Sequence, residues 1–136
     1  MDYVKRAESI LTSLKEQEER EKCDRNIKVK FKLVTTSQLR KFLALSNEIY
    51  NEAKLIDLKG KIEDDKLPQN IINEILSMKV KLVYQCGREK AVKDFVEKTE
   101  LLKEIDKIDG SYKRFKEFFS YVEALTAYHK YVGGRE

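Results

Sequence analysis

The sequence predicts an all-α fold, a compact bundle of about five helices. Apolar residues recur every three or four positions along most of the chain, which is the spacing of helices that bury one face. Turn and cap residues separate these stretches, and the chain has only one proline and five glycines. Its 136 residues and 41% hydrophobic content suit a single helical domain, residues 1–136, with a substantial core.

The N-terminal part predicts one helix followed by an extended segment. The first apolar residues have helical spacing: Val4, Ala7, Ile10, Leu11 and Leu14. Residues 27–33 instead alternate apolar residues with lysines, which is typical of extended chain. Three alternatives remain open for this segment: an arm packed on the bundle, a strand paired with another copy, or a helix imposed by tertiary contacts.

Two helices are predicted in the middle of the chain. Thr35 and Gln38 have the spacing of a capping box, so the second helix is expected to begin there and to run to about Ile56. Residues 57–67 form the most loop-like stretch of the sequence. Pro68, the only proline, fits the first position of a third helix.

The pattern changes direction after Gly87. The apolar positions beyond it shift by roughly half a turn, so either Gly87 breaks the third helix or two halves of a longer helix face different partners. Residues 109–111, Asp-Gly-Ser, are turn and cap residues before the last helix. The glycine pair 133–134 is expected to end that helix.

The last predicted helix, residues 111–134, holds seven of the thirteen aromatic residues. Its apolar arc covers roughly 200° of the helical wheel, about twice what a surface helix needs to face its own core. We therefore expect this helix to contact more than one neighbour. The isolated chain is expected to cover the excess apolar surface by self-association, most simply as a twofold homodimer.

No catalytic arrangement is found in the sequence. His129, the only histidine, is expected to be a buried imidazole bonded to the backbone rather than a general base. Glu63, Asp64 and Asp65 are expected to form a solvated loop rather than a cation site. We predict no enzymatic activity, cofactor, metal or small-molecule substrate. A small metal-dependent nuclease is the weakest alternative, supported only by abundant Asp and Glu.

Composition restricts the cellular setting. The charged fraction is 38% but the net charge is only +4, so most charges are expected on solvated helix faces of mixed sign. The start of the sequence lacks the pattern of an export signal, and no eighteen apolar residues run together. We expect a cytoplasmic protein without a membrane partner, and reduced thiols at the two cysteines.

The basic residues allow an anion site. Arg40 and Lys41 are expected in the first turn of the second helix, where exposed amide groups and the Arg40 guanidinium would hold a phosphate. Further basic residues follow at Lys81, Arg88, Lys130 and Arg135. A scatter of solvated basic side chains is the alternative, and the charge pattern alone does not decide between the two.

Three motifs resemble a known family. They are TTSQLRKFL at 35–43, LVYQCGRE at 82–89 and YVEALTAYHKYVGG at 121–134. In this order and spacing they resemble the small subunit of the type III-A CRISPR effector complex, the Csm type. The resemblance spans about residues 35–134, and its closing motif is the most specific. It implies a helical, non-catalytic subunit that stacks in several copies along the guide RNA and target RNA, beside other subunits of an antiviral complex.

The resemblance also implies which residues contact RNA. The resemblance implies contacts by Arg40, Lys41, Arg88, Lys130 and Arg135, and the charge pattern adds Lys81 as a sixth candidate RNA contact. Since such a complex serves any guide, these residues are expected to meet the sugar-phosphate backbone rather than base edges. Four other motif residues are expected to be structural: Tyr84, Glu123, Tyr128 and His129. A protein-only helical adaptor or oligomerisation module, without RNA contact, is the alternative function.

Overall fold

The computed structural model describes residues 3–23 and 34–133, with side chains in α1 described through Arg20; these residues form six helices and no strand. The helices are α1 (Tyr3–Cys23), α2 (Thr36–Leu58), α3 (Gln69–Arg88), α4 (Lys90–Thr99), α5 (Leu101–Ile108) and α6 (Tyr112–Tyr131). The predicted all-α class is confirmed for this part of the chain. The segment predicted to be extended, residues 27–33, lies outside the described residues.

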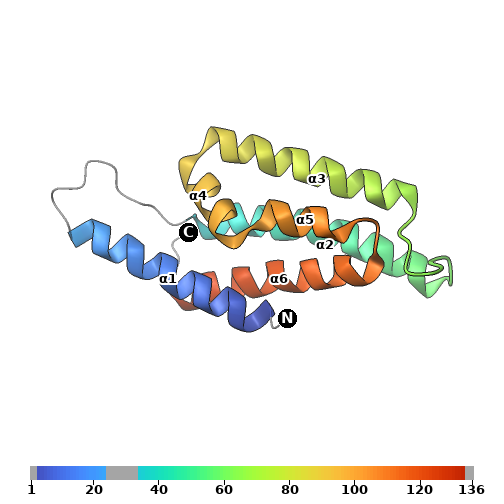
Figure 1. Ribbon diagram of the computed structural model, residues 1–136, viewed down its shortest axis with the longest axis horizontal. Coiled ribbons are helices and arrows are strands. Elements are labelled where there is room, and N and C mark those ends of the chain that lie inside the picture. The colour runs from blue at the N-terminus through green and yellow to red at the C-terminus, as the bar shows by residue number, and fades with distance from the viewer. Residues whose placement is uncertain (1–2, 24–33, 134–136) are drawn as a thin grey trace.

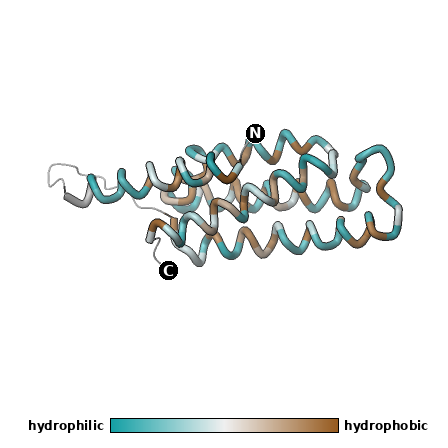
Figure 2. The backbone as a smooth tube through the Cα atoms, turned by 90° about the horizontal axis from the view of Figure 1, so that it is seen from below, coloured by the Kyte–Doolittle hydropathy of each residue, from teal (hydrophilic) through white to brown (hydrophobic). Residues whose placement is uncertain are grey.

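The helices pack around α6. This helix contacts α1, α2 and α5, whereas α3 contacts α2, α4 and α5. Figure 1 shows α3 along one side of the bundle and α1 along the opposite side, with α2, α5 and α6 between them. The far end of α1 extends beyond the bundle and is hydrophilic (Figure 2).

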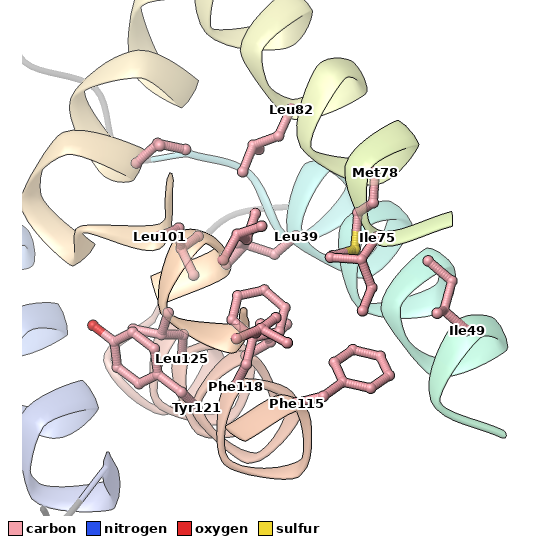
Figure 3. Close-up of a cluster of buried hydrophobic side chains, with 14 of the residues drawn as sticks. Leu39, Ile49, Ile75, Met78, Leu82, Leu101, Phe115, Phe118, Tyr121 and Leu125 are labelled. Atoms are coloured by element: carbon pink, nitrogen blue, oxygen red, sulfur yellow. The ribbon is translucent and has the colours of Figure 1, made fainter. Parts of the chain in front are cut away.

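One continuous core joins these helices. Figure 3 shows side chains of α2, α3, α5 and α6 pointing toward one another. The labelled core residues are Leu39, Ile49, Ile75, Met78, Leu82, Leu101, Phe115, Phe118, Tyr121 and Leu125. Burial of one such side chain stabilises the fold by roughly 1.5–3 kcal/mol before entropy is subtracted, so this cluster determines how α3 and α6 sit on α2.

The predicted start of α2 is confirmed. The Thr35 hydroxyl accepts a hydrogen bond from the Gln38 amide at 3.3 Å, and the Gln38 side-chain oxygen accepts one from the Thr35 amide at 2.8 Å. Pro68 differs from its prediction by one position, because it is the N-cap of α3 and not the first helical residue.

Asp65 lies in an exposed loop, as predicted, but its side chain also bonds to the start of α6. Its carboxylate accepts hydrogen bonds from the Ser111 hydroxyl and from the Lys113 amide, the latter at 2.8 Å. These bonds lower the pKa of the Asp65 carboxyl. Asp65 therefore joins Ser111 in capping the start of α6, a contact between residues 46 positions apart.

The region after Gly87 forms two short helices where the sequence suggested one. Gly87 lies inside α3, which ends only at Arg88, and the next break is Glu100 in the left-handed conformation with φ of 59°. The last carbonyl of α4, at Thr99, accepts hydrogen bonds from Arg6 at 3.1 Å and from the Tyr121 hydroxyl at 2.8 Å. Donors from α1 and α6 thus provide the hydrogen bonds that the end of α4 lacks within its own helix. Local sequence does not predict these partners.

Arg6 connects α1 to the rest of the bundle. Its guanidinium donates to the Glu104 carboxylate at 2.8 Å and lies 4.6 Å from the centre of the Tyr121 ring. Burial alone would raise the pKa of Glu104, but hydrogen bonds from Arg6 and Lys107 together lower it. Burial also raises the pKa of Tyr121 to about 12. The Arg6 and Glu104 charges are therefore paired at a largely buried junction.

The aromatic helix is mostly covered within a single chain. Five of its aromatic rings are buried and Tyr128 is half-buried, whereas Tyr131 is 82% exposed. The buried aromatic residues are Tyr112, Phe115, Phe118, Phe119 and Tyr121. The prediction of more than one neighbour is confirmed, but those neighbours are α1, α2 and α5 of the same chain. The expectation that α6 keeps an excess apolar face for another copy is wrong.

An exposed apolar surface lies instead on α3. Leu76, Val80, Val83 and Tyr84 are 49–67% exposed and follow the helical spacing of one outward face. We call these four residues the α3 outer face. The other residues interspersed on the same side are uncharged: Gln69, Asn73, Ser77 and Gly87. Tyr84, expected to be structural, is thus an exposed residue of this face, and Glu123 is also exposed.

Candidate nucleic-acid interface

A groove of about 350 Å³ lies between α2, α3 and α4. We call it the α2–α3–α4 groove. Ten apolar side chains line it: Val34, Leu39, Phe42, Leu45, Met78, Leu82, Val92, Phe95, Val96 and Leu101. Six polar or charged side chains complete the lining: Gln38, Lys41, Lys81, Gln85, Arg88 and Glu89. The groove therefore combines an apolar floor with three cations and one carboxylate.

Helix geometry places the cations along the groove. Lys81 and Arg88 are seven residues apart on α3, which puts them on the same side of the helix and about 10 Å apart along its axis. Gln85 lies between them, one turn after Lys81. Lys41 reaches the groove from α2, on the other wall. Three of the six predicted RNA contacts are thus brought together by the fold.

The side chains of these three cations are exposed. Among the described residues, none of Lys41, Lys81 and Arg88 forms an ion pair. Other basic residues of the bundle behave differently: Lys79 lies 2.5 Å from Asp106, and Arg6 is bound to Glu104. Positive charge on the groove rim therefore remains available for an anionic ligand.

A side-chain contact joins two residues that line the groove. The Gln38 amide nitrogen donates a hydrogen bond to the Glu89 carboxylate, which joins the start of α2 to the junction of α3 and α4. Glu89 has extended backbone between the two helices, with φ of −132°. Because Gln38 also belongs to the α2 capping box, the position of this groove wall depends on the start of α2.

His129 supports the same wall from α6. It is fully buried, its Nε2 donates to the Val34 carbonyl oxygen, and its Nδ1 accepts from the Thr36 hydroxyl at 3.4 Å. Burial lowers the pKa of His129, so the neutral imidazole is favoured. The prediction of a buried, backbone-bonded histidine is confirmed, and its role is to hold the chain entering α2.

The other predicted RNA contacts lie elsewhere. Arg40 and Lys41 are the fifth and sixth residues of α2, so they follow the first turn in which they were expected. Arg40 is exposed beside Lys41 but does not line the groove. Lys130 is exposed in the last turn of α6, and Arg135 lies outside the described residues. The phosphate site predicted at the start of α2 also lacks one donor, because the Gln38 amide already donates to the Thr35 hydroxyl.

Several residues that line the groove carry no functional signal in the sequence. Phe42, Leu45, Gln85 and Glu89 line it, but their local patterns are those of ordinary helix residues. The seven-residue spacing of Lys81 and Arg88 was visible in the sequence. No local signal connects these residues to Lys41, since the three meet only when α3 packs on α2.

The residues that the structure describes contain no group of three or more His, Cys, Asp or Glu placed to hold a metal ion. Among the helices of this part of the chain, none has the length and apolar character required to span a membrane. Cys86 is a half-buried free thiol whose pKa is raised by burial, the opposite of an activated nucleophile.

Comparison with known proteins identifies the family. A profile of the family described as Csm2 Type III-A matches residues 13–135. The chain belongs to the Csm2 family of type III-A CRISPR systems. This result confirms the resemblance to the Csm-type small subunit that three sequence motifs suggested.

Curated members of the Csm2 family match most of the chain. A Mycobacterium tuberculosis protein described as "CRISPR system Cms protein Csm2" is 33% identical over 135 residues, which cover 99% of this chain and 94% of the relative. The Csm2 protein of Streptococcus thermophilus is 36% identical over 104 residues, covering 76% and 77% of the two chains. That of Enterococcus italicus is 37% identical over 105 residues, covering 76% and 71%.

Proposed function

We propose that this Csm2-family chain is a non-catalytic subunit that stacks in several copies along the guide and target RNA and contacts their sugar-phosphate backbone in antiviral defence. The observation that carries the RNA contact is the group of three exposed cations on the α2–α3–α4 groove. Cations that bind phosphates release counterions, so binding by Lys41, Lys81 and Arg88 is expected to weaken with salt.

The test is target-RNA retention by the assembled effector complex over a series of salt concentrations. Replacement of Lys41, Lys81 and Arg88 by alanine is expected to weaken retention. It should also reduce the log–log salt slope by roughly 2 per subunit if most of the three contact phosphates. The matched control removes the same charge from three exposed lysines outside the groove: Lys54, Lys98 and Lys103. Equal effects of the two triple variants would contradict the contact assignment.

We further propose that copies of the chain associate through the α3 outer face. Although 38% of the residues are charged, this exposed side of α3 carries none. An uncharged apolar stripe meets its own copy without like-charge repulsion, which favours a second copy of the chain related by a twofold axis. Self-association in the isolated protein would use the same surface.

The α3 outer face also supports the second candidate function, a protein-only helical adaptor. In that case the groove cations would only solubilise the chain, and the subunit would enter its complex through protein contacts alone. Crosslinking in the assembled complex separates the two functions. RNA crosslinks to α2 or α3 support the RNA-binding subunit, whereas protein crosslinks alone, with unchanged RNA retention in the groove variant, support the adaptor.

A further inference from the structure

We propose that the α2–α3–α4 groove binds the base of an unpaired nucleotide, while the rim cations bind the phosphates on either side of it. This inference rests on the proposed RNA-binding function and specifies the ligand of the same site as single-stranded or bulged RNA. A surface that contacted only phosphates would need cations alone. Here the cations surround an apolar depression of about 350 Å³, a volume within the range of small-ligand pockets.

The floor of the groove suits the face of a base. Phe42 is half-buried, lines the groove, and packs its ring at 90° against Phe118, which fixes its position. Leu45 and Leu82 extend the apolar surface on the two facing helices. Every base has an apolar π-face, so such a floor accepts any of the four bases without reading their identity. That property agrees with a subunit that serves any guide.

The rim suits the remainder of a nucleotide. Lys81 and Arg88 lie two turns apart on one wall, and Lys41 lies on the other, so a chain crossing the groove meets a cation on each side of the base. Gln85, between the α3 cations, carries both a donor and an acceptor for any base edge. Glu89 adds a carboxylate to the rim, and this carboxylate already accepts a hydrogen bond from the Gln38 side chain.

The ligand must be unpaired because a paired base is stacked in a helix and hides its face. An extruded or single-stranded base exposes that face, which stacks on aromatic side chains in other single-strand binding proteins. An acidic peptide would satisfy the cations, but it would need an apolar anchor at one position between two acids. Each nucleotide of an RNA chain carries both a charged phosphate and a base with an apolar face.

The test is photocrosslinking of the full-length chain to an RNA duplex with one bulged 4-thiouridine. The comparison RNA is the same duplex with an adenosine opposite that uridine, so that it is paired. We expect about tenfold more crosslinking from the bulged RNA, mapped by mass spectrometry to the peptides that contain Phe42, Leu45 or Gln85. Equal crosslinking of the two RNAs, or crosslinks that map outside the groove, would overturn the inference.

A pair of matched variants sharpens the test. Leu45→Trp fills the groove without a change in charge, and Leu55→Trp places the same substitution on the same helix at a residue that is 58% exposed and outside the groove. We expect the first to abolish the preference for the bulged RNA and the second to retain it. If Leu45→Trp does not fold, the comparison of the two RNAs on the unaltered chain still decides.

The outcomes distinguish this inference from the proposed function. RNA retention that depends on Lys41, Lys81 and Arg88, without preference for the bulged base, leaves the backbone-binding subunit intact and removes only the nucleotide pocket. Retention that is insensitive to all three cations in the assembled complex contradicts the RNA contact itself, and the pocket with it.

Discussion

Helices α6 and α3 differ in how much of their apolar surface the same chain covers. The aromatic helix α6 was expected to offer an excess apolar face to another copy, yet its neighbours in the same chain cover most of it. Helix α3 has fewer aromatic residues, yet it exposes four large apolar or aromatic side chains on one uncharged side. Apolar content on a helical wheel therefore predicts how much surface must be covered, but not whether the cover comes from the same chain.

The largest expected loss of stability comes from a substitution in the buried face of α6. Phe118 is 2% exposed, and Phe118→Ala should lower the free energy of unfolding by about 3–5 kcal/mol because it removes a buried ring and leaves a cavity. Val83→Ala on the α3 outer face, where the side chain is 49% exposed, should cost much less. Urea unfolding measures both, and equal losses would remove the contrast between the two helices.

The next effect concerns the attachment of α1 to α5 and α6. Arg6→Ala should cost about 3 kcal/mol, because it leaves the buried Glu104 carboxylate with less compensation and removes the cation over the Tyr121 ring. A double-mutant cycle with Glu104→Gln isolates the charge pairing, since the neutral partner no longer needs the arginine. A purely additive cycle would show that the pairing contributes little.

A smaller effect comes from acid titration of His129. Because burial lowers the folded-state pKa of His129, the unfolded chain takes up this proton at higher pH than the folded chain. This contribution to stability is fully present above pH 6.5 and is lost as the pH falls through the folded-state pKa. His129→Gln, which retains a donor for the Val34 carbonyl, should lack this part of the pH dependence measured by thermal unfolding. Identical profiles for the two proteins would contradict the assignment.

The smallest expected effect on stability is paired with a large effect on association. Val80→Glu on the α3 outer face should change the free energy of unfolding by no more than about 0.5 kcal/mol. It should also weaken self-association by at least tenfold, because a twofold interface would place two carboxylates close together. Leu55→Glu, at a 58% exposed residue of α2, is the control. Sedimentation velocity distinguishes them, and unchanged association of the Val80 variant would exclude this surface.

Local sequence predicted the helix starts and the buried histidine well. The caps at Thr35 and Ser111 depend on residues three positions away, so a single sequence is sufficient to find them. The break at Glu100 and the capping role of Asp65 were missed, because each depends on partners from distant helices. Five RNA-contact residues were proposed from family motifs and Lys81 from the charge pattern. Only the packing of α3 on α2 brings Lys41, Lys81 and Arg88 to one groove.

The sequence by itself determined the helical class, most helix boundaries and membership of the Csm2 family. Periodicity, caps and motifs each depend on residues that are close together in the sequence. Tertiary structure alone decided which apolar face stays exposed and which cations share a groove. Those outcomes depend on residues far apart in the sequence. Lys41 and Lys81 line one groove although they are forty positions apart, and Arg6 bonds to Glu104 across 98 positions. Local preferences carry no information about such pairs until the core has packed.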